Sequence, residues 1–207
     1  MYYLDKEIWF PEVHEATEDG LLAIGGDLSA ERLMYAYRHG IFPWFEVGQP
    51  ILWWSPDPRM VLYPEELKVS KSMKQVLGNT SFEITINRAF SEVIHECSIV
   101  NREGQDSTWI TKEMKDAYIN LHELGHAKSV EVWKDKGLVG GLYGLDLGDV
   151  FCGESMFTKE SNASKVGFIT FLQNTNYKLI DCQVYTEHLA SLGAREIPRE
   201  EFLNQLT

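Results

Sequence analysis

Two predicted strands in the second half of the chain carry acidic and amide side chains where a buried strand is normally apolar. The first begins at residue 150, reaches Glu154 and leads through a polar turn into a helix opened by Asn162. The second, at residues 178–184, carries Asp181 and Gln183. A buried carboxylate is costly unless it is paired or hydrogen-bonded. Two neighbouring interior strands with this composition therefore predict a site.

The spacing of these polar residues limits how they can be arranged. Asp181 and Gln183 are two residues apart on a strand, so they are expected to share a face while Cys182 points the other way. Adjacent carboxylates repel, so either one is protonated or both are held by donors such as backbone amides or a substrate cation. The residues alone leave two interpretations open, a functional site or a buried hydrogen-bond network that fixes the sheet.

The order of the predicted elements indicates an α+β fold. Strands and helices alternate from residue 60 onward, with a hairpin signal at 134–137 and a polar loop at 101–107. We expect a small aromatic-rich α/β lobe, 1–59, followed by a larger mixed-sheet domain, 60–207. The expected strands are 60–63, 81–86, 128–133, 138–143, 150–154 and 178–184; the expected helices are 70–77, one capped by Asn87, 111–124, 162–172, a short one after Thr186 and a last one from Pro198.

Caps mark the clearest helices, and a proline-rich segment follows the first of them. Ser29 is the expected N-cap of a helix that Gly40 ends, and Thr111 and Gly125 bracket another. Residues 41–59 combine tryptophans with prolines so densely that no regular structure is expected there. The aromatic side chains should cover either a core between two lobes or a ligand, and the pattern leaves both open.

Composition limits the class of protein. With 207 residues, 44% of them hydrophobic, the chain can bury one good core or one core and a small appendage. Its apolar runs are too short to span a bilayer and its N-terminus lacks a leader pattern, which predicts a cytoplasmic protein. The three cysteines lie in apolar contexts that suit a reducing compartment. A formal net charge of −12 argues against non-specific nucleic-acid binding but not against a local basic patch.

Two further motifs match known patterns only superficially. His122 and His126 fit the H-E-x-x-H zinc motif, but Gly125 is needed to stop the helix, so the two imidazoles are not expected to share a face. No metal site is therefore predicted. Gly140, Gly141 and Gly144 lie in a predicted hairpin and match no phosphate-binding loop, so they are expected to allow sheet bending or close backbone approach.

Several longer segments carry a family resemblance. They include Trp53-Trp-Ser-Pro-Asp-Pro-Arg59, Gly153-Glu-Ser-Met-Phe157 and Leu179-Ile-Asp-Cys-Gln183, and they extend in order through 20–29, 36–45, 50–59, 108–110, 129–133, 138–144, 153–157, 162–165, 179–183, 191–194 and 197–199. In these segments the chain resembles the leucyl/phenylalanyl-tRNA–protein transferase family over nearly its whole length.

The resemblance implies a fold and an activity. It implies a GNAT-like (N-acyltransferase) larger domain in a bacterial cytoplasmic enzyme. The family moves Leu or Phe, less often Met, from aminoacyl-tRNA to a protein N-terminal Arg or Lys, and so marks the protein for the N-degron pathway. The catalytic network implied here is Glu154, Asp181 and Gln183. Because an aminoacyl-tRNA is already an activated ester, no metal or other cofactor is expected.

The resemblance also implies binding residues. The apolar amino-acid pocket carries over to Trp44, Trp109, Phe151, Gly153, Met156, Phe171 and Ile180. A tRNA contact is expected at Lys71 and Lys74, in a basic cluster that is thin here. Lys128 stands where the family often has His. We expect a localised, salt-sensitive tRNA contact.

Physical chemistry gives the implied residues roles. We expect Gln183 to orient the attacking amine and steer or relay its proton, while Asp181 and Glu154 fix its geometry. The acidic pair should favour a cationic acceptor residue. Two rivals remain. An acetyl-CoA-dependent N-acetyltransferase would need a pyrophosphate loop that the sequence lacks, and a non-catalytic N-degron or tRNA-binding module would not need Gln183.

Overall fold

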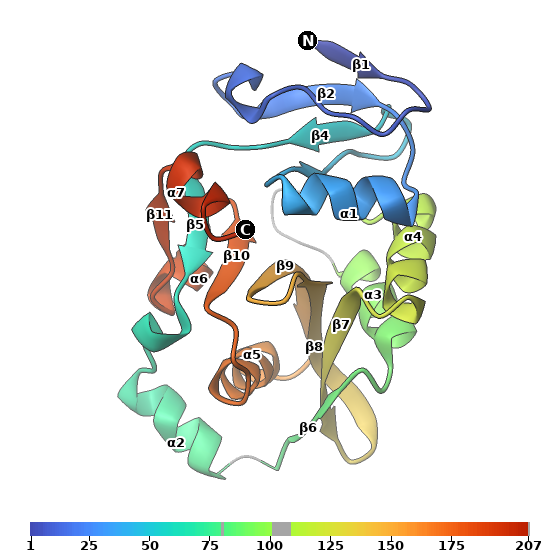
Figure 1. The fold of residues 1–207 in the computed structure, drawn as a ribbon. Helices are drawn as coiled ribbons and strands as arrows, with labels where there is room; N and C mark the ends of the chain where they lie inside the picture. The colour runs from blue at the N-terminus through green and yellow to red at the C-terminus, as the bar shows by residue number, and fades with distance from the viewer. Residues whose placement is uncertain (80, 101–108, 207) are drawn as a thin grey trace.

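The computed structural model describes residues 1–79, 81–100 and 109–206, so the predicted loop at 101–107 lies outside the described residues. The chain forms a smaller and a larger sheet, and helix α1 (Ala30–Arg38) lies between them (Figure 1). Mixed sheets covered by helices confirm the α+β prediction.

The larger sheet has the strand order β11-β5-β10-β9-β8-β7-β6. Strands β9 and β10 run parallel, whereas the other neighbouring strands pair antiparallel. The sheet is therefore mixed, as predicted. The strands are β5 (Arg59–Leu62), β6 (Glu83–Ile86), β7 (Ala127–Lys134), β8 (Gly137–Asp146), β9 (Val150–Thr158), β10 (Leu179–Gln183) and β11 (Arg195–Ile197).

Helices cover both faces of this sheet. Helices α3 and α4 pack on one face and share an apolar cluster with Tyr143 and Phe157, while α5 packs on the other against Val130 and Leu142 (Figure 1). The helices beyond α1 are α2 (Lys71–Asn79), α3 (Phe90–Ile99), α4 (Lys112–Glu123), α5 (Ala163–Gln173), α6 (Glu187–Ser191) and α7 (Arg199–Leu203), with short 3₁₀ turns at Val13–Glu15 and Pro64–Glu66.

The smaller sheet corrects one prediction. Its order is β1-β2-β4-β3, and two of its strands lie in the proline-rich segment that was expected to have no regular structure. Prolines are tolerated there because β3 is very short and lies at the edge of the sheet. The strands are β1 (Tyr2–Leu4), β2 (Leu21–Gly25), β3 (Phe42–Pro43) and β4 (Leu52–Trp54).

One apolar core joins the two sheets. Trp53 of β4 is fully buried in the same cluster as Val61 of β5 and Met114 of α4. Part of the aromatic segment thus forms a core between the lobes, as one of the two interpretations predicted. The division at residues 59 and 60 stays a prediction.

The helix signals in the sequence are mostly confirmed. The Ser29 hydroxyl accepts from the backbone of α1, and Gly40 follows that helix with a φ of 73°. The Thr111 hydroxyl accepts the amide of Met114 at 3.2 Å, and Gly125 follows α4 with a φ of 83°. Glycine adopts this left-handed conformation without steric cost, which explains both helix ends.

The predicted cap at Asn87 is wrong. Helix α3 begins at Phe90, and the Asn87 side chain instead accepts the amide of Ser129 at 3.0 Å. The buried carboxylate of Glu131 accepts the Ala89 amide at 3.2 Å and so satisfies the start of the helix from a neighbouring strand. A partner so distant in sequence is invisible to a local capping rule.

The glycines of β8 behave as predicted. A Cβ atom at Gly140 would lie 2.8 Å from the Cβ of Ala163, and one at Gly144 would lie 2.2 Å from the carbonyl oxygen of Cys152. Both distances are too short for a side chain. These glycines therefore let β8 lie close to α5 and to β9.

Candidate active site

A pocket of about 400 Å³ opens where β9 and β10 stop pairing. Their last paired residues are Cys152 and Asp181, and both strands continue beyond this point. The sequence pattern predicted that this strand ends at Glu154, which is wrong. Strand β9 continues to Thr158 and bends beneath α1 (Figure 1). The parted strands expose Glu154 and Gln183 to the space between them.

Irregularities in β9 and β10 turn the side chains of Glu154 and Gln183 toward the pocket. Glu154 has no partner of its own on β8, because Gly153 pairs with Gly144 and Ser155 already pairs with Tyr143. On β10, a similar register shift separates Asp181 from Gln183, whose φ is 63°. The strict alternation predicted for 181–183 is therefore interrupted. Bulges of this kind redirect side chains and are frequent beside active sites.

Asp181 is held by an arginine that the sequence interpretation missed. Arg59 donates two parallel hydrogen bonds to its carboxylate, from Nε at 2.8 Å and from Nη2 at 2.7 Å. Both side chains are buried, with exposed fractions of 1% for Arg59 and 0% for Asp181. The guanidinium also lies over the rings of Phe42 and Phe202, at 4.8 and 4.7 Å from their centroids. The charge of Asp181 is thus neutralised in place.

Gln183 connects the two acidic residues. Its backbone amide donates to Asp181 Oδ1 at 2.9 Å, and its side-chain Nε2 donates to Glu154 Oε1 at 2.7 Å. Because the amide nitrogen is committed to Glu154, the amide oxygen is left as a hydrogen-bond acceptor.

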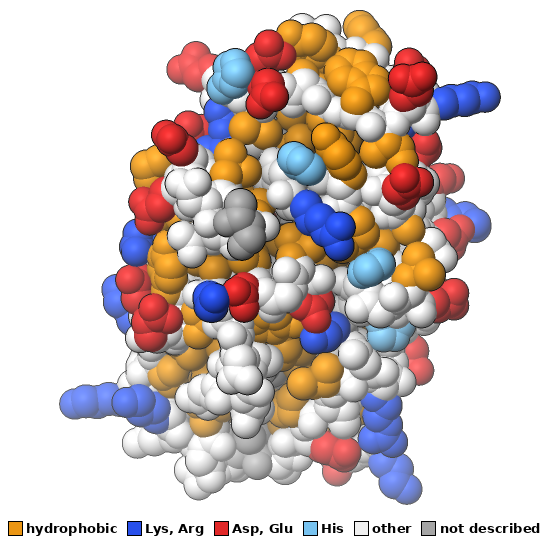
Figure 2. Space-filling model, viewed as in Figure 1, with side chains coloured by type: hydrophobic (Ala, Val, Ile, Leu, Met, Phe, Trp, Pro, Cys, Tyr) orange, Lys and Arg blue, Asp and Glu red, His pale blue; other side chains and the backbone are white. Residues whose placement is uncertain are grey.

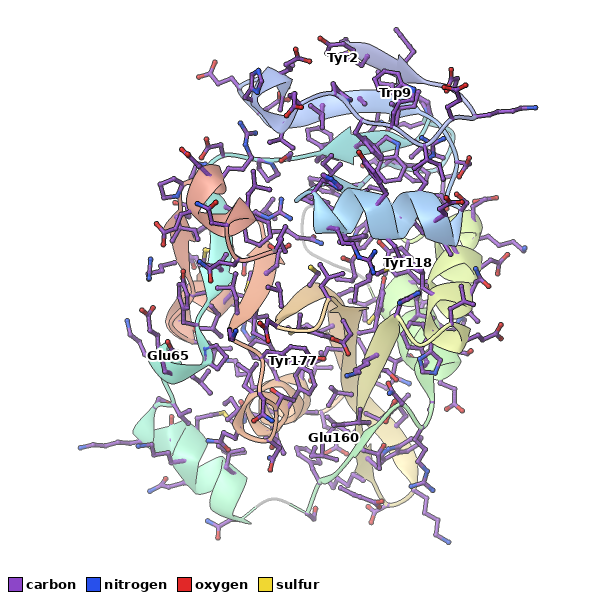
Figure 3. The ribbon with its side chains drawn as sticks, in the orientation of Figure 1. Tyr2, Trp9, Glu65, Tyr118, Glu160 and Tyr177 are labelled. Atoms are coloured by element: carbon purple, nitrogen blue, oxygen red, sulfur yellow. The ribbon has the colours of Figure 1, made fainter. Side chains whose placement is uncertain are left out.

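Two tyrosines hold the other side of Glu154. Tyr37 of α1 donates to Oε1 at 2.7 Å and Tyr118 of α4 donates to Oε2 at 3.0 Å. The two hydroxyls also bond to each other, and Figure 3 shows Tyr118 between α4 and α1. Burial raises the pKa of Glu154 to about 7, although the bonds from Tyr37 and Tyr118 act to lower it. No local sequence pattern marked either tyrosine as a partner of a carboxylate.

The predicted pocket residues converge, with one exception. Trp44, Trp109, Phe151, Gly153, Met156 and Ile180 all line the pocket. Phe171 lies behind it, with its ring edge-on to Phe151 at a centroid distance of 4.9 Å. Leu142, Phe168 and Leu189 add apolar lining that sequence reasoning did not identify.

His188 is a further lining residue that was missed. Its Nε2 is buried and has no hydrogen-bond partner among the described residues. Burial, with a smaller contribution from the charge of Lys165, lowers the pKa of His188. The ring is therefore a neutral imidazole near pH 7.

The cysteines beside the site are not activated. Burial, reinforced by the negative charge of Asp181, raises the pKa of both the Cys152 and the Cys182 thiol. Reactive cysteines have the opposite shift. The pocket therefore offers hydrogen-bonding and positioning groups and no thiolate nucleophile.

The zinc motif does not assemble. His122 Nδ1 contacts the carbonyl oxygen of Ala127 at 2.8 Å and its ring stacks on Phe90 at 4.3 Å, while Gly125 ends the helix before His126. Within residues 1–79, 81–100 and 109–206, no group of three or more His, Cys, Asp or Glu could hold a metal ion. In the same residues, no helix has the length and apolar character needed to cross a membrane.

An apolar pocket beside a partly buried acid–amide cluster is the arrangement expected of an enzyme that binds an apolar group and positions a reacting group next to it. Comparison with known proteins identifies the family. The chain belongs to the leucyl/phenylalanyl-tRNA protein transferase family, whose main model matches residues 61–207 and whose N-terminal-domain model matches residues 26–57. The predicted family and the predicted aminoacyltransferase class are confirmed.

Similar proteins cover the whole chain. A leucyl/phenylalanyl-tRNA–protein transferase of Flavobacterium johnsoniae is 62% identical over 100% of this chain and 99% of its own. One of Christiangramia forsetii is 59% identical, with 100% of both chains covered. A GCN5-related N-acetyltransferase from Kribbella flavida is 12% identical with a TM-score of 0.35, covering 83% of this chain and 61% of its own. At this TM-score the GNAT-like description stays a prediction.

Proposed function

We propose that this protein transfers Leu or Phe, and less often Met, from aminoacyl-tRNA to the α-amine of a protein N-terminal Arg or Lys. The modified protein would then be a substrate of the N-degron pathway, in the cytoplasm. The observation that carries the proposal is the meeting, in one pocket, of Glu154, Asp181, Gln183 and all the predicted apolar residues except Phe171.

The apolar side of the pocket suits the transferred amino acid. Phe151, Met156 and Ile180 surround a volume of about 400 Å³ with hydrophobic atoms. Such a surface accepts Leu and Phe alike, because apolar pockets discriminate weakly between hydrophobic groups of similar size. A charged side chain would lose its hydration there without gaining a partner.

The polar side of the pocket suits the attacking amine. The amide oxygen of Gln183 can accept a hydrogen bond from the neutral amine and orient its lone pair toward the ester carbonyl. The new C–N bond forms as the ester C–O bond breaks, and the proton lost by nitrogen ends on the ribose oxygen. Asp181 and Arg59 fix the Gln183 backbone, so the acceptor oxygen is pre-positioned.

Within the described acidic cluster, Glu154 is the residue that can favour a cationic acceptor. The acidic pair was expected to supply it, but Asp181 is already paired with Arg59. An ionised Glu154 is therefore the group of the cluster that can attract an N-terminal Arg or Lys.

The proposed tRNA contact lies away from the pocket. Lys71 and Lys74 are exposed on α2, which lies at the opposite end of the molecule from the smaller sheet (Figure 1). Acidic side chains are scattered over the visible surface in Figure 2, and they leave no continuous basic face in this view. A long substrate such as tRNA could bridge the pocket and α2 through a few phosphate contacts.

The test is transfer of labelled Leu from Leu-tRNA to a peptide that begins with Arg, beside a peptide that begins with Ala. The wild type should modify the Arg peptide, and Gln183→Ala should lose this activity. Gln173→Ala, at an exposed glutamine of α5, is the matched control and should transfer normally. Binding of Leu-tRNA without transfer by the wild type would instead indicate a binding module.

A further inference from the structure

Three oxygen-bearing groups from three elements form a closed ring next to Gln183. The Tyr37 hydroxyl lies 2.7 Å from Glu154 Oε1, and the Tyr118 hydroxyl lies 3.0 Å from Glu154 Oε2. The third side of the ring is the hydrogen bond between the two hydroxyls. Tyr37 and Tyr118 are buried, with exposed fractions of 1% and 0%, so water does not supply their partners.

The number of hydrogens in the ring determines how many of its three contacts can be hydrogen bonds. Each phenol has one hydrogen to donate, and an ionised carboxylate has none. With Glu154 ionised, both phenol hydrogens point to its oxygens, and the contact between the tyrosines is left with facing lone pairs. With one added proton on Oε2, Glu154 donates to Tyr118, Tyr118 donates to Tyr37, and Tyr37 donates to Oε1. Every side of the ring then has its hydrogen.

We infer that Glu154 carries a proton in the unliganded protein, that Tyr37 and Tyr118 are positioning residues that place this proton within the ring, and that a cationic acceptor residue displaces it when it binds. The first half concerns the unliganded protein alone. The second half rests on the proposed function.

The charges around Glu154 agree with this assignment. Asp181 and Gln183 face it from β10, and Arg59 of β5 cancels the charge of Asp181. Burial, followed by the charge of Glu154, raises the pKa of Tyr37 and of Tyr118 well above the usual value, so both remain phenols. Among the residues that the structure describes, the further titratable neighbours are Tyr143 of β8, which faces Tyr118, and the Cys152 thiol of β9, which burial keeps protonated.

Loss of the proton therefore changes the charge of the whole cluster. With Glu154 protonated, the Arg59–Asp181 pair leaves the cluster neutral. Without the proton, the cluster carries one unpaired negative charge that faces the pocket. Burial places the pKa of Glu154 at about 7, so the two states are close in free energy and a nearby cation can select the ionised one.

The proton can leave without disturbing Gln183. Gln183 Nε2 and Tyr37 both donate to Oε1, whereas the added proton resides on Oε2. The exchange is balanced: the neutral carboxylic acid releases one proton to solvent, and the resulting carboxylate pairs with the incoming cation, which keeps its own hydrogens. Gln183 thus presents the same amide oxygen in both states.

Infrared difference spectroscopy of the unliganded protein tests the first half. Subtracting the spectrum of Glu154→Gln from that of the wild type should leave a carboxylic-acid C=O band at about pH 6 that is gone at about pH 8.5. Glutamine is a suitable reference because its amide can make the same neutral ring. Absence of the band at the lower pH would overturn the inference.

Tyrosine variants test whether the ring holds the proton. Removing the Tyr118 hydroxyl takes away the acceptor of the acid hydrogen, so Tyr118→Phe should shift the band to higher frequency. Tyr37→Phe should shift it less, and Tyr3→Phe, at a tyrosine with an exposed fraction of 74%, should leave it unchanged. An unshifted band in Tyr118→Phe would show that the tyrosines do not position the proton.

Calorimetry tests the displacement. Binding of an Arg-initiated peptide is measured in two buffers with different ionisation heats, for the wild type and for Glu154→Gln. The variant corrects for any proton that the α-amine of the peptide itself releases. The wild type should release close to one proton more than the variant at about pH 6 and the same number at about pH 8.5. Equal proton release by the two proteins at the lower pH overturns the displacement. Absence of peptide binding would contradict the proposed acceptor specificity and also the displacement of the proton. The infrared result would still show whether Glu154 carries a proton in the unliganded protein.

Discussion

Gln183 donates its side-chain amide to Glu154 across a gap between two parallel strands that stop pairing just before both residues. Each strand is irregular at this point. Glu154 has no paired residue on β8, and the pairing of β10 with β5 shifts register between Asp181 and Gln183. The side-chain hydrogen bond therefore links the two strands where their backbones no longer pair. Because Glu154 Oε1 accepts this 2.7 Å bond, the nitrogen of the Gln183 amide must face Glu154 and the amide oxygen is turned away from it.

Shortening Gln183 should disconnect this bond while keeping the amide. Gln183→Asn tolerates the φ of 63° but cannot span the distance to Glu154. We expect single-turnover transfer to fall roughly 100-fold, because an acceptor misplaced by about 1 Å can cost that much. Gln173→Asn on α5 is the control, and equal rates for both variants would contradict the positioning role.

Breaking the Arg59–Asp181 pair should destabilise the fold. Removal of Arg59 in Arg59→Met leaves a buried, uncompensated carboxylate, so unfolding free energy should fall by about 3–5 kcal/mol in urea titrations. The matched control is Arg195→Met, which removes the exposed pair with Glu66 and should cost about 1 kcal/mol or less. Equal losses would mean that burial of the first pair has no energetic consequence.

The raised pKa of Glu154 should make stability depend on pH. Its value is about 7 in the folded protein against 4.5 for the free side chain, so the folded state binds the proton more tightly. This contribution is fully present below about pH 4.5 and is lost as pH rises to about 7, a total of about 3 kcal/mol. Urea titrations of the wild type and Glu154→Gln across this range should diverge by that order. A constant difference between the two would contradict the shift.

Filling the pocket should change the amino-acid preference. Met156→Trp places a larger ring in the space beside Phe151 and should reduce Phe transfer more than Leu transfer, by roughly 10-fold in the ratio of kcat/KM. Competition between Phe-tRNA and Leu-tRNA measures this ratio directly. A parallel loss for both substrates would place the amino-acid side chain elsewhere.

Neutralising the basic residues of α2 should weaken tRNA binding and its salt dependence. In Lys71→Ala/Lys74→Ala, the slope of log affinity against log salt should decrease by up to about 2, one contribution for each lost phosphate contact. Lys6→Ala/Lys136→Ala removes two exposed lysines elsewhere and should keep the slope. If the control loses as much slope as the α2 variant, the contact is not localised on α2.

The local features of this fold follow from short stretches of the sequence. Ser29 and Thr111 open their helices, Gly40 and Gly125 end them, and Asp135 and Lys136 form the predicted hairpin turn with positive φ. Such features depend on neighbours within a few residues, so local pattern and turn chemistry suffice. Sequence pattern also singled out three polar residues on interior strands, and those residues do meet in one pocket.

The partners of these residues, in contrast, come from elements that are distant in the chain and meet only when it folds. Arg59 is 122 positions from Asp181, and Tyr37 is 117 positions from Glu154, so neither pairing leaves a local signal. No local pattern marks Tyr37 or Tyr118 as a carboxylate partner, because helical periodicity reports burial but not the partner of a buried hydroxyl. The left-handed Gln183 and the buried ring of hydroxyls exist because the surrounding elements over-determine them. Packing of α1, α4, β9 and β10 therefore sets the chemistry of the site.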